Sequence, residues 1–135
     1  MLKRSHNTPR LILNRVGAYT TDTAYRIRAL RGTADALVYG YYNSLTALSA
    51  ELEGRHYGGG VLELVPSEIE KLLMPTTETV VPDIERLDRM VREGKVADTL
   101  EIQSEDVLGA LTKVEQMDLL AAWANLRDRR HRLLA

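Results

Sequence analysis

The chain has 135 residues and a mass of 15.2 kDa, which suits one domain with a hydrophobic core, and its formal net charge is −1. The absence of cysteine excludes disulfides and thiol catalysis, and the three histidines are too far apart in sequence to suggest a zinc site. No apolar run reaches the roughly 18 residues that span a bilayer, and the N-terminal residues lack the apolar middle of a secretory signal, so we expect a cytoplasmic protein without a membrane partner.

Charge is distributed unevenly along the chain. Residues 1–31 contain seven basic side chains and the single acid Asp22, residues 32–125 contain seven basic and seventeen acidic ones, and the last ten residues carry +3. Basic segments on both sides of an acidic middle would orient a protein on a polyanion. The alternative is an ordinary solvated surface.

The first expected element is a strand over residues 9–15, followed by a turn at Val16-Gly17 and a second extended run through Leu30. Within this run Arg26 and Arg28 alternate with apolar residues, so both guanidinium groups would leave one face of a strand. Residues 20–23 favour a loop or turn just before them.

A long helix is predicted next, from an N-cap at Thr33 to Gly54, because leucine and tyrosine recur at helical spacing. We assign Tyr41 and Tyr42 to its core face in preference to base stacking. The pair Asn43-Ser44 is a candidate to cap or cross-link elements of the fold.

Three consecutive glycines, Gly58, Gly59 and Gly60, follow this helix and lead into a short strand over residues 61–65. Glycine costs backbone entropy and has no side chain, so the triplet predicts a sharp chain reversal or a close approach of backbone amides to a bulky partner. Arg55 and Tyr57 beside it favour an anionic polymer as that partner. The alternative is an ordinary helix-to-strand connection.

The second half is predicted to be mainly helical. A brief helix over residues 66–70 has Ser67 and Glu70 as its capping box and ends before Pro75, and residues 76–81 read as a linker between a first part, 1–75, and a second part, 76–135, packed as one unit. A helix from Ile84 to Gly94 and a short one over residues 104–111 follow. The expected fold class is α+β, with a small antiparallel sheet near the N-terminus, a central amphipathic helix and a helical C-terminal half.

The last predicted helix begins at a capping box of Thr112 and Glu115 and continues through Leu133, about 30 Å at roughly 1.5 Å per residue. Its apolar stripe includes Trp123, which we read as a core anchor. The four arginines near its end are interpreted as a solvated helix terminus that complements the helix dipole: Arg127, Arg129, Arg130 and Arg132.

Known catalytic motifs are absent. The chain has no Gly-x-Ser-x-Gly sequence, no phosphate loop ending in Gly-Lys-Ser or Gly-Lys-Thr, and no Gly-x-Gly-x-x-Gly sequence. The central carboxylates are expected at surface positions, where nothing would retune them: Glu51, Glu53, Glu63, Glu68 and Glu70. The residues therefore indicate a binding module.

Several blocks, in a fixed order, carry a family resemblance. The central blocks are Tyr42-Asn43-Ser44-Leu45-Thr46, residues 51–55, Tyr57-Gly58-Gly59-Gly60 and residues 62–68, with Pro75 at their end. The outer blocks are Leu13-Asn14 with Gly17, Thr21-Asp22 and Tyr25-Arg26 before them, and residues 87–95, Trp123 and residues 126–130 after them. Over nearly its whole length the chain resembles the C-terminal region of adenine-specific, S-adenosylmethionine-dependent DNA methyltransferases of restriction-modification systems.

Two motifs of such enzymes are missing. In that family a glycine-containing motif of a Rossmann-like domain holds the cofactor and an Asn-Pro-Pro-Tyr or Asn-Pro-Pro-Phe motif grips the target adenine, whereas this sequence has no Asn-Pro pair at all. The resemblance thus implies no catalytic, cofactor or metal site in the chain and no activity by itself. S-adenosylmethionine is expected in a separate catalytic region, with the chain as a fragment, a truncated product or one subunit of a split enzyme.

By this resemblance the chain grips duplex DNA beside a flipped base, and its expected partners are double-stranded DNA and a catalytic domain or subunit. Phosphate contacts are expected from arginines and from glycine amides: Arg10, Arg15, Arg26, Arg28, Arg55, Gly58, Gly59 and Gly60. Base-edge contacts are expected from Asn14, Thr21, Asp22, Tyr25 and Tyr57.

A second hypothesis is an interaction scaffold that docks on a catalytic methyltransferase partner and scarcely touches DNA. The long last helix with Trp123 favours it. A free-standing enzyme ranks third.

Overall fold

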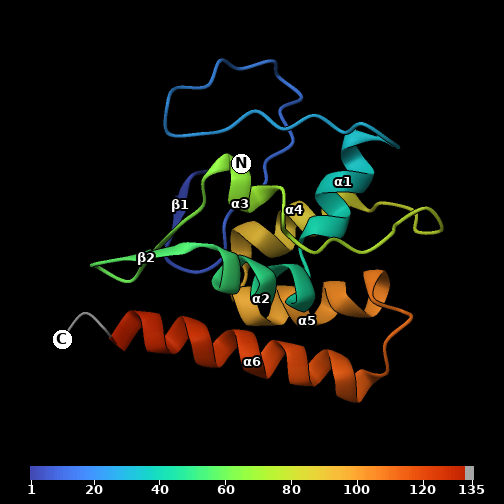
Figure 1. The fold of residues 1–135 in the computed structure, drawn as a ribbon. Coiled ribbons are helices and arrows are strands. Elements are labelled where there is room, and N and C mark those ends of the chain that lie inside the picture. The colour runs from blue at the N-terminus through green and yellow to red at the C-terminus, as the bar shows by residue number, and fades with distance from the viewer. Residues whose placement is uncertain (133–135) are drawn as a thin grey trace.

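A computed structural model describes residues 1–132. The elements, in chain order, are β1 (Arg4–Ser5), α1 (Ala34–Tyr41), α2 (Ser44–Glu53), β2 (Arg55–Tyr57), β3 (Val61–Glu63), α3 (Pro66–Ile69), α4 (Ile84–Glu93), α5 (Val96–Val107) and α6 (Lys113–Arg132) (Figure 1). The predicted α+β class is confirmed, with a small antiparallel sheet and a helical C-terminal half. Among these helices none is long and apolar enough to cross a membrane.

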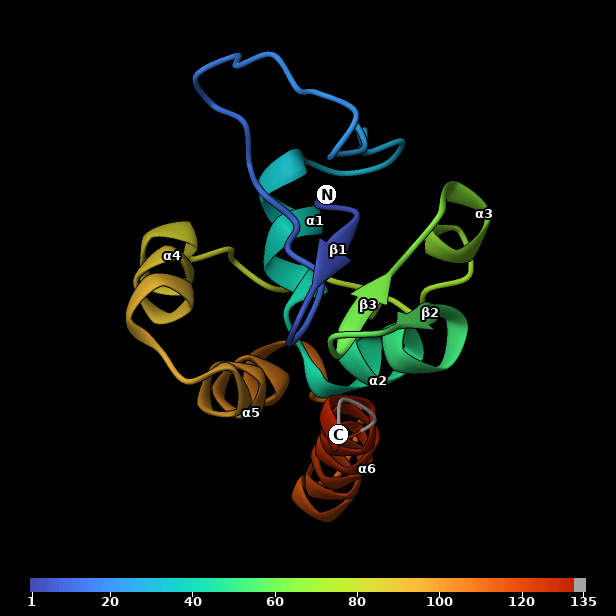
Figure 2. The ribbon, with the colours of Figure 1, turned by 90° about the vertical axis from the view of Figure 1, so that its left-hand side faces the viewer.

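The sheet is antiparallel with the order β1-β3-β2 (Figure 2). The predicted strand after the glycines is confirmed as β3, whose Leu62 is fully buried. The predicted strands over residues 9–15 and 16–30 are wrong, because this stretch is irregular apart from a single bridge between Leu2 and Ala24. Arg26 and Arg28 belong to no strand of this sheet, so their alternation with apolar residues reflects no strand face.

The predicted long helix is two helices. Thr33 is the N-cap, as predicted, but α1 ends at Tyr41 and α2 starts after a new N-cap, Asn43. The Asn43 Oδ1 accepts from the Thr46 N–H at 2.9 Å while its Nδ2 donates to the Gly40 carbonyl. The side chain thus takes over backbone groups that a continuous helix would pair, and the capping role considered for Asn43 is confirmed.

Tyr41 and Tyr42 lie in the core, as predicted, 3% and 5% exposed. Their hydroxyls donate to the carbonyls of Pro9 and Leu11, both at 2.8 Å, and so fasten the N-terminal segment to the helices. Burial raises the pKa of Tyr41 far above its usual value and that of Tyr42 to about 12.

One predicted helix cap and one predicted helix start are wrong. In α3 the carboxylate that accepts a backbone N–H is Glu68, from Val65 at 2.9 Å, so the expected pair of Ser67 and Glu70 is wrong. α5 begins at Val96, far before the predicted position 104. Its buried face includes the polar residues Gln103 and Ser104. Because these positions are not apolar, the spacing of apolar residues does not indicate a helix before residue 104.

α6 begins as predicted. The Thr112 N–H and hydroxyl donate to Glu115 Oε2 at 2.7 and 3.0 Å, and these two bonds hold the pKa of Glu115 below its usual value. The Glu115 N–H donates back to Thr112 Oγ1 at 3.2 Å, which completes the capping box. Trp123 is fully buried against Ala47 and Leu100, which confirms it as a core anchor. The predicted end at Leu133 lies outside the described residues.

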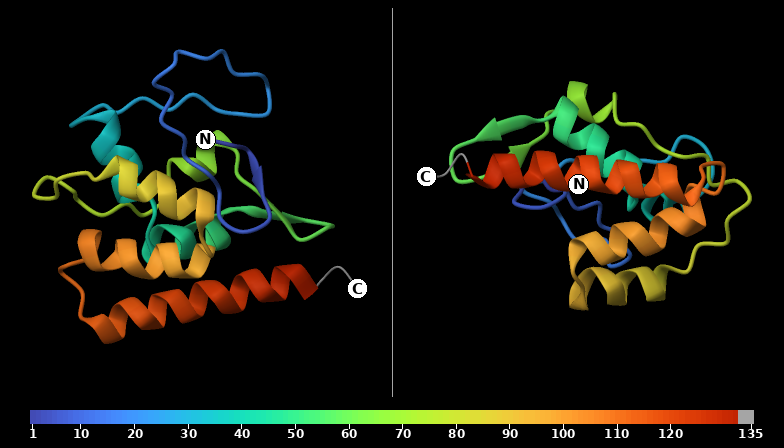
Figure 3. Two further views of the ribbon diagram at one scale, coloured as in Figure 1. Left: turned by 180° about the vertical axis from the view of Figure 1, so that it is seen from behind. Right: turned by 90° about the horizontal axis from the view of Figure 1, so that it is seen from below.

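Arg130 and Glu51 form a buried ion pair, 2% and 3% exposed, so the surface positions predicted for both are wrong. Arg130 Nη2 and Nε donate to the two oxygens of Glu51 at 2.6 and 3.0 Å. Its other donors meet backbone carbonyls of His6, Asn7 and Gly60. α6 lies along α2 and α5 (Figure 3). Arg130 also ties α6 to the turn between β2 and β3, the β2–β3 hairpin, and to residues 6 and 7 near the N-terminus.

Replacing Arg130 with methionine should lower the free energy of unfolding by about 3–5 kcal/mol, because the Glu51 carboxylate would stay buried without its partner. Arg129→Met is the matched control, since Arg129 is exposed one position away, and should change it by less than about 0.5 kcal/mol. Urea titration measures both.

The double variant Glu51→Met with Arg130→Met separates charge from packing. It should recover part of the loss, because no uncompensated charge remains in the core. Equal stability of the Arg130→Met protein and the unmodified protein would contradict this account of the ion pair.

Candidate nucleic-acid interface

Residues 12–32, called here the N-terminal loop, form a long irregular segment that stands apart from the helices (Figure 1). Its base is closed by backbone bonds from Lys3 N–H to the Thr23 carbonyl at 3.1 Å and from Tyr25 N–H to the Met1 carbonyl at 2.8 Å. Structureless loops beyond about 12–15 residues are uncommon in compact domains and are usually functional.

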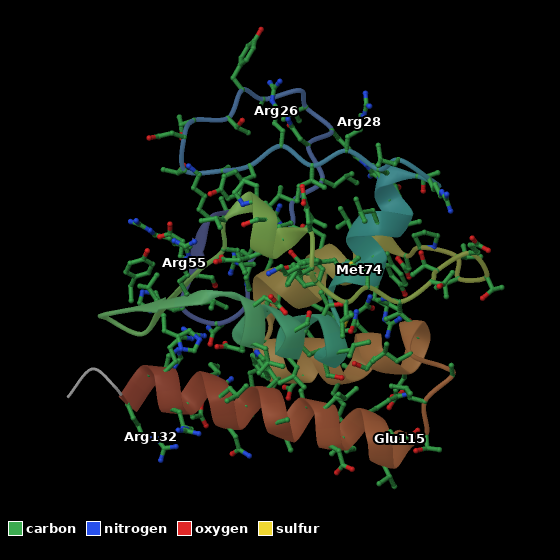
Figure 4. All side chains as sticks on the ribbon, in the orientation of Figure 1. Arg26, Arg28, Arg55, Met74, Glu115 and Arg132 are labelled. Carbon is green, nitrogen blue, oxygen red and sulfur yellow. The ribbon has the colours of Figure 1, made fainter. Side chains whose placement is uncertain are left out.

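The loop and its start carry the predicted phosphate-binding arginines. Arg26 and Arg28 are exposed and point away from the helices (Figure 4), and Arg10 is exposed at the entry to the loop. None of these three makes a side-chain ion pair within residues 1–132. Arg15 Nη2 contacts Asp35 Oδ2 at 2.7 Å, in an exposed pair. The loop therefore presents guanidinium groups that the protein itself does not neutralise.

Three predicted base-contacting residues help to build the loop. The Asn14 side chain accepts from the Ala18 N–H at 2.9 Å and donates to its carbonyl at 2.8 Å, around a Gly17 with φ of 64°. Thr21 Oγ1 lies 2.8 Å from Thr23 Oγ1. Tyr25 is half-buried under the Lys3 ammonium, 4.8 Å from the ring centre. Asp22 is exposed beside them.

The remaining predicted residues lie on the β2–β3 hairpin, away from Arg26 and Arg28 (Figure 4). Arg55 Nε contacts Glu68 Oε1 at 2.8 Å, and this contact raises the pKa of the arginine. The Tyr57 ring is 49% exposed and lies 6.0 Å from the guanidinium of Arg4. The predicted residues thus form two groups, one on the loop and one on the hairpin.

The glycine triplet is the turn of this hairpin. Gly59 and Gly60 have φ of 88° and 68°, values that disfavour a side chain, so a chain reversal is built here as expected. Gly58 and Gly59 are exposed, whereas Gly60 is buried and its carbonyl accepts from Arg130 Nη1. Two of the three glycines therefore remain accessible to a partner.

Two residues at this end were missed by sequence reasoning. Arg4 on β1 pairs with Glu63 at 2.6 Å and lies beside Tyr57. Arg130 fixes the position of the hairpin turn. Its place seven residues after Trp123, on the same helix face, was a signal in the sequence.

Within the described part of the chain, no group of three or more histidine or carboxylate side chains is positioned to hold a metal ion. The arginines of the loop and hairpin, with tyrosines and exposed backbone amides beside them, suit an anionic polymer as a partner.

A family model described as "Type II methyltransferase M.Eco57I, C-terminal domain" matches residues 1–108. The match covers the N-terminal loop, the hairpin and the helices through α5, and stops before α6. No curated protein and no solved structure matches the chain.

Alanine substitutions in the glycine triplet should separate its positions. Gly58→Ala should leave the free energy of unfolding unchanged or slightly raised, because a Cβ there meets no atom within 4 Å and the φ is not positive. Gly59→Ala should cost about 1–2 kcal/mol, because its φ is +88°. Urea titration of both variants measures the difference, and equal stabilities would contradict the assigned turn geometry.

Proposed function

The chain belongs to the family of M.Eco57I-type C-terminal domains of type II methyltransferases, and we propose that it is the part of such an enzyme that grips DNA around the target adenine. An enzyme that modifies a base must take it out of the stack, which requires a hold on the flanking duplex. In this proposal the catalytic residues and S-adenosylmethionine belong to a catalytic domain or subunit that acts together with this chain.

The observation that carries the proposal is the set of exposed guanidinium groups without carboxylate partners on and beside the N-terminal loop, namely Arg10, Arg26, Arg28 and Arg31. Phosphates would pair with these groups and release counterions from the DNA. Phosphate contacts fix register and orientation, so the loop would position the domain on the duplex.

Sequence selection needs contacts to base edges. We assign this role to Asn14, Thr21 and Tyr25 on the loop and to Tyr57 on the hairpin. Asn14 keeps one amide proton and one lone pair beyond its two bonds to Ala18, the capacity needed to reach a base edge. On the hairpin, Arg55 and the amides of the exposed Gly58 and Gly59 would take the phosphates of a neighbouring segment.

A scaffold that docks on a catalytic partner is the second candidate. Trp123 no longer supports it, since the ring is fully buried within the chain. Exposed apolar side chains of the loop support it instead, with Val16 at 88%, Tyr19 at 95% and Leu30 at 85% exposed. Gel-shift titration separates the two: DNA binding by the chain alone supports a grip on DNA, whereas partner-dependent methylation without such binding supports the scaffold.

The double variant Arg26→Ala with Arg28→Ala should weaken binding to duplex DNA and reduce the slope of log K against log salt by about 2, one unit per lost phosphate contact. Arg89→Ala with Lys71→Ala is the matched control, because it removes the same charge from exposed positions on α4 and after α3. Fluorescence anisotropy of a labelled duplex, repeated over a range of salt concentrations, gives both quantities. An unchanged slope would remove these two arginines from the proposed interface.

Gly58→Ala tests the hairpin. If its amide lies against the DNA backbone, the added methyl group should lower DNA affinity without lowering the stability of the free protein, because the position is open in the structure. Anisotropy and urea titration of one preparation give the two values. Unaltered affinity would leave Gly58 outside the interface.

A further inference from the structure

A cavity of about 240 Å³ lies between the N-terminal segment of residues 5–10 and the start of α5. Its floor is apolar, formed by Tyr42, Val91 and Leu100. Its rim is polar and is formed by consecutive residues of the N-terminal segment. An apolar floor with a few convergent polar groups is the usual composition of a small-ligand site.

The rim side chains have no partners inside the protein. The side chains of His6, Asn7, Thr8 and Arg10 make no hydrogen bond to any described residue, although the backbone carbonyls of His6, Asn7 and Thr8 all accept one. Thr8 is 8% exposed and lines the cavity, and its hydroxyl has no hydrogen-bond partner among the described residues. A ligand in the cavity would therefore find hydrogen-bond donors and acceptors that the protein itself does not use.

The positive end of α5 borders the same cavity through Gly94 and Val96. The N-cap position is Lys95, whose side chain caps nothing, so the first amides of this twelve-residue helix have no side-chain acceptor. The helix dipole and the Arg10 guanidinium both favour negative charge at this place.

From these contacts we propose that the cavity binds a nucleoside monophosphate unit, with its phosphate at Arg10 and the start of α5 and its nucleoside against Tyr42, Val91 and Leu100. The choice of a nucleotide among anionic ligands rests on the proposed function in DNA binding. The unit is either an unpaired nucleotide of a DNA strand or a free nucleotide, and the chemistry of recognition is the same.

A second groove, of about 420 Å³, shares Arg10, Tyr42 and Val91 with the cavity. Its charged lining is mixed, with Arg15 and Arg92 beside Glu85 and Asp88, and Arg92 pairs with Asp88 at 2.7 Å. Arg10 lines both spaces and so lies at the boundary between them.

The test is a titration of the full ¹⁵N-labelled chain with deoxyadenosine 5′-monophosphate, followed by NMR. Saturable shifts at the amides of Thr8, Gly94 and Val96 are expected. Deoxyadenosine and inorganic phosphate should each bind more weakly at the same amides, because each makes half of the contacts. Equal affinity for inorganic phosphate and the nucleotide, or no shift at these amides, would overturn the proposal.

Two variants test the named contacts. Thr8→Val keeps the side-chain shape and removes the hydroxyl, and should weaken nucleotide binding about threefold to tenfold. Arg10→Gln should weaken it about tenfold or more. Thr79→Val and Arg89→Gln, both at exposed positions outside the cavity, are the controls and should leave binding unchanged. Test variants that bind like these controls would overturn the assignment of Thr8 and Arg10.

Competition identifies the source of the nucleotide. Displacement of the bound monophosphate by a duplex with one unpaired adenine, and not by a fully paired duplex, assigns the cavity to a strand nucleotide, whereas binding of both duplexes without displacement assigns it to a free nucleotide. Binding of duplex DNA without any nucleotide-induced shift at the amides that line the cavity overturns this inference alone. Nucleotide binding without duplex binding overturns the role in DNA recognition alone.

Discussion

The fold depends on one buried ion pair, between Arg130 of α6 and Glu51 of α2. All five guanidinium donors of Arg130 are used: two bind the carboxylate, and the others bind the carbonyls of His6, Asn7 and Gly60. Removing two charges from water is costly, so such a pair contributes specificity of structure more than stability. Here it fixes the hairpin turn and the cavity rim relative to the helices.

This pair also shows that α6 shares its core with the region that the family model matches. The family match stops at residue 108, yet Glu51 lies inside it and takes its counter-charge from residue 130. Trp123, also beyond the match, fills the space between Ala47 and Leu100. Without α6, the matched region would have no counter-charge for Glu51 and would expose the apolar side chains of Ala47 and Leu100 to water. α6 is therefore part of the core of this chain.

Local signals in the sequence predicted local structure well. The N-caps Thr33 and Thr112, the stop at Gly94 and the core positions of Tyr41 and Trp123 all depend on neighbours a few residues away. Strand pairing and buried charge depend on residues far along the chain: Arg130 and Glu51 are 79 positions apart. Likewise, no local pattern reveals that β3 pairs with β1 and β2, or that the N-terminal loop of residues 12–32 joins no sheet.

The arginines of the chain differ in how readily they could exchange their partners for phosphates. The pairs of Arg4, Arg15 and Arg55 are exposed on the arginine side, where an ion pair contributes little and is screened by salt, so a phosphate could replace the carboxylate at small cost. Arg130 is held by five bonds in the core and cannot make this exchange. Arg10, Arg26 and Arg28 have no partner to give up. Under the proposed function, this ordering would give the first contacts with DNA to the N-terminal loop and a supporting role to the hairpin. Arg130 holds the hairpin turn and the N-terminal residues in place.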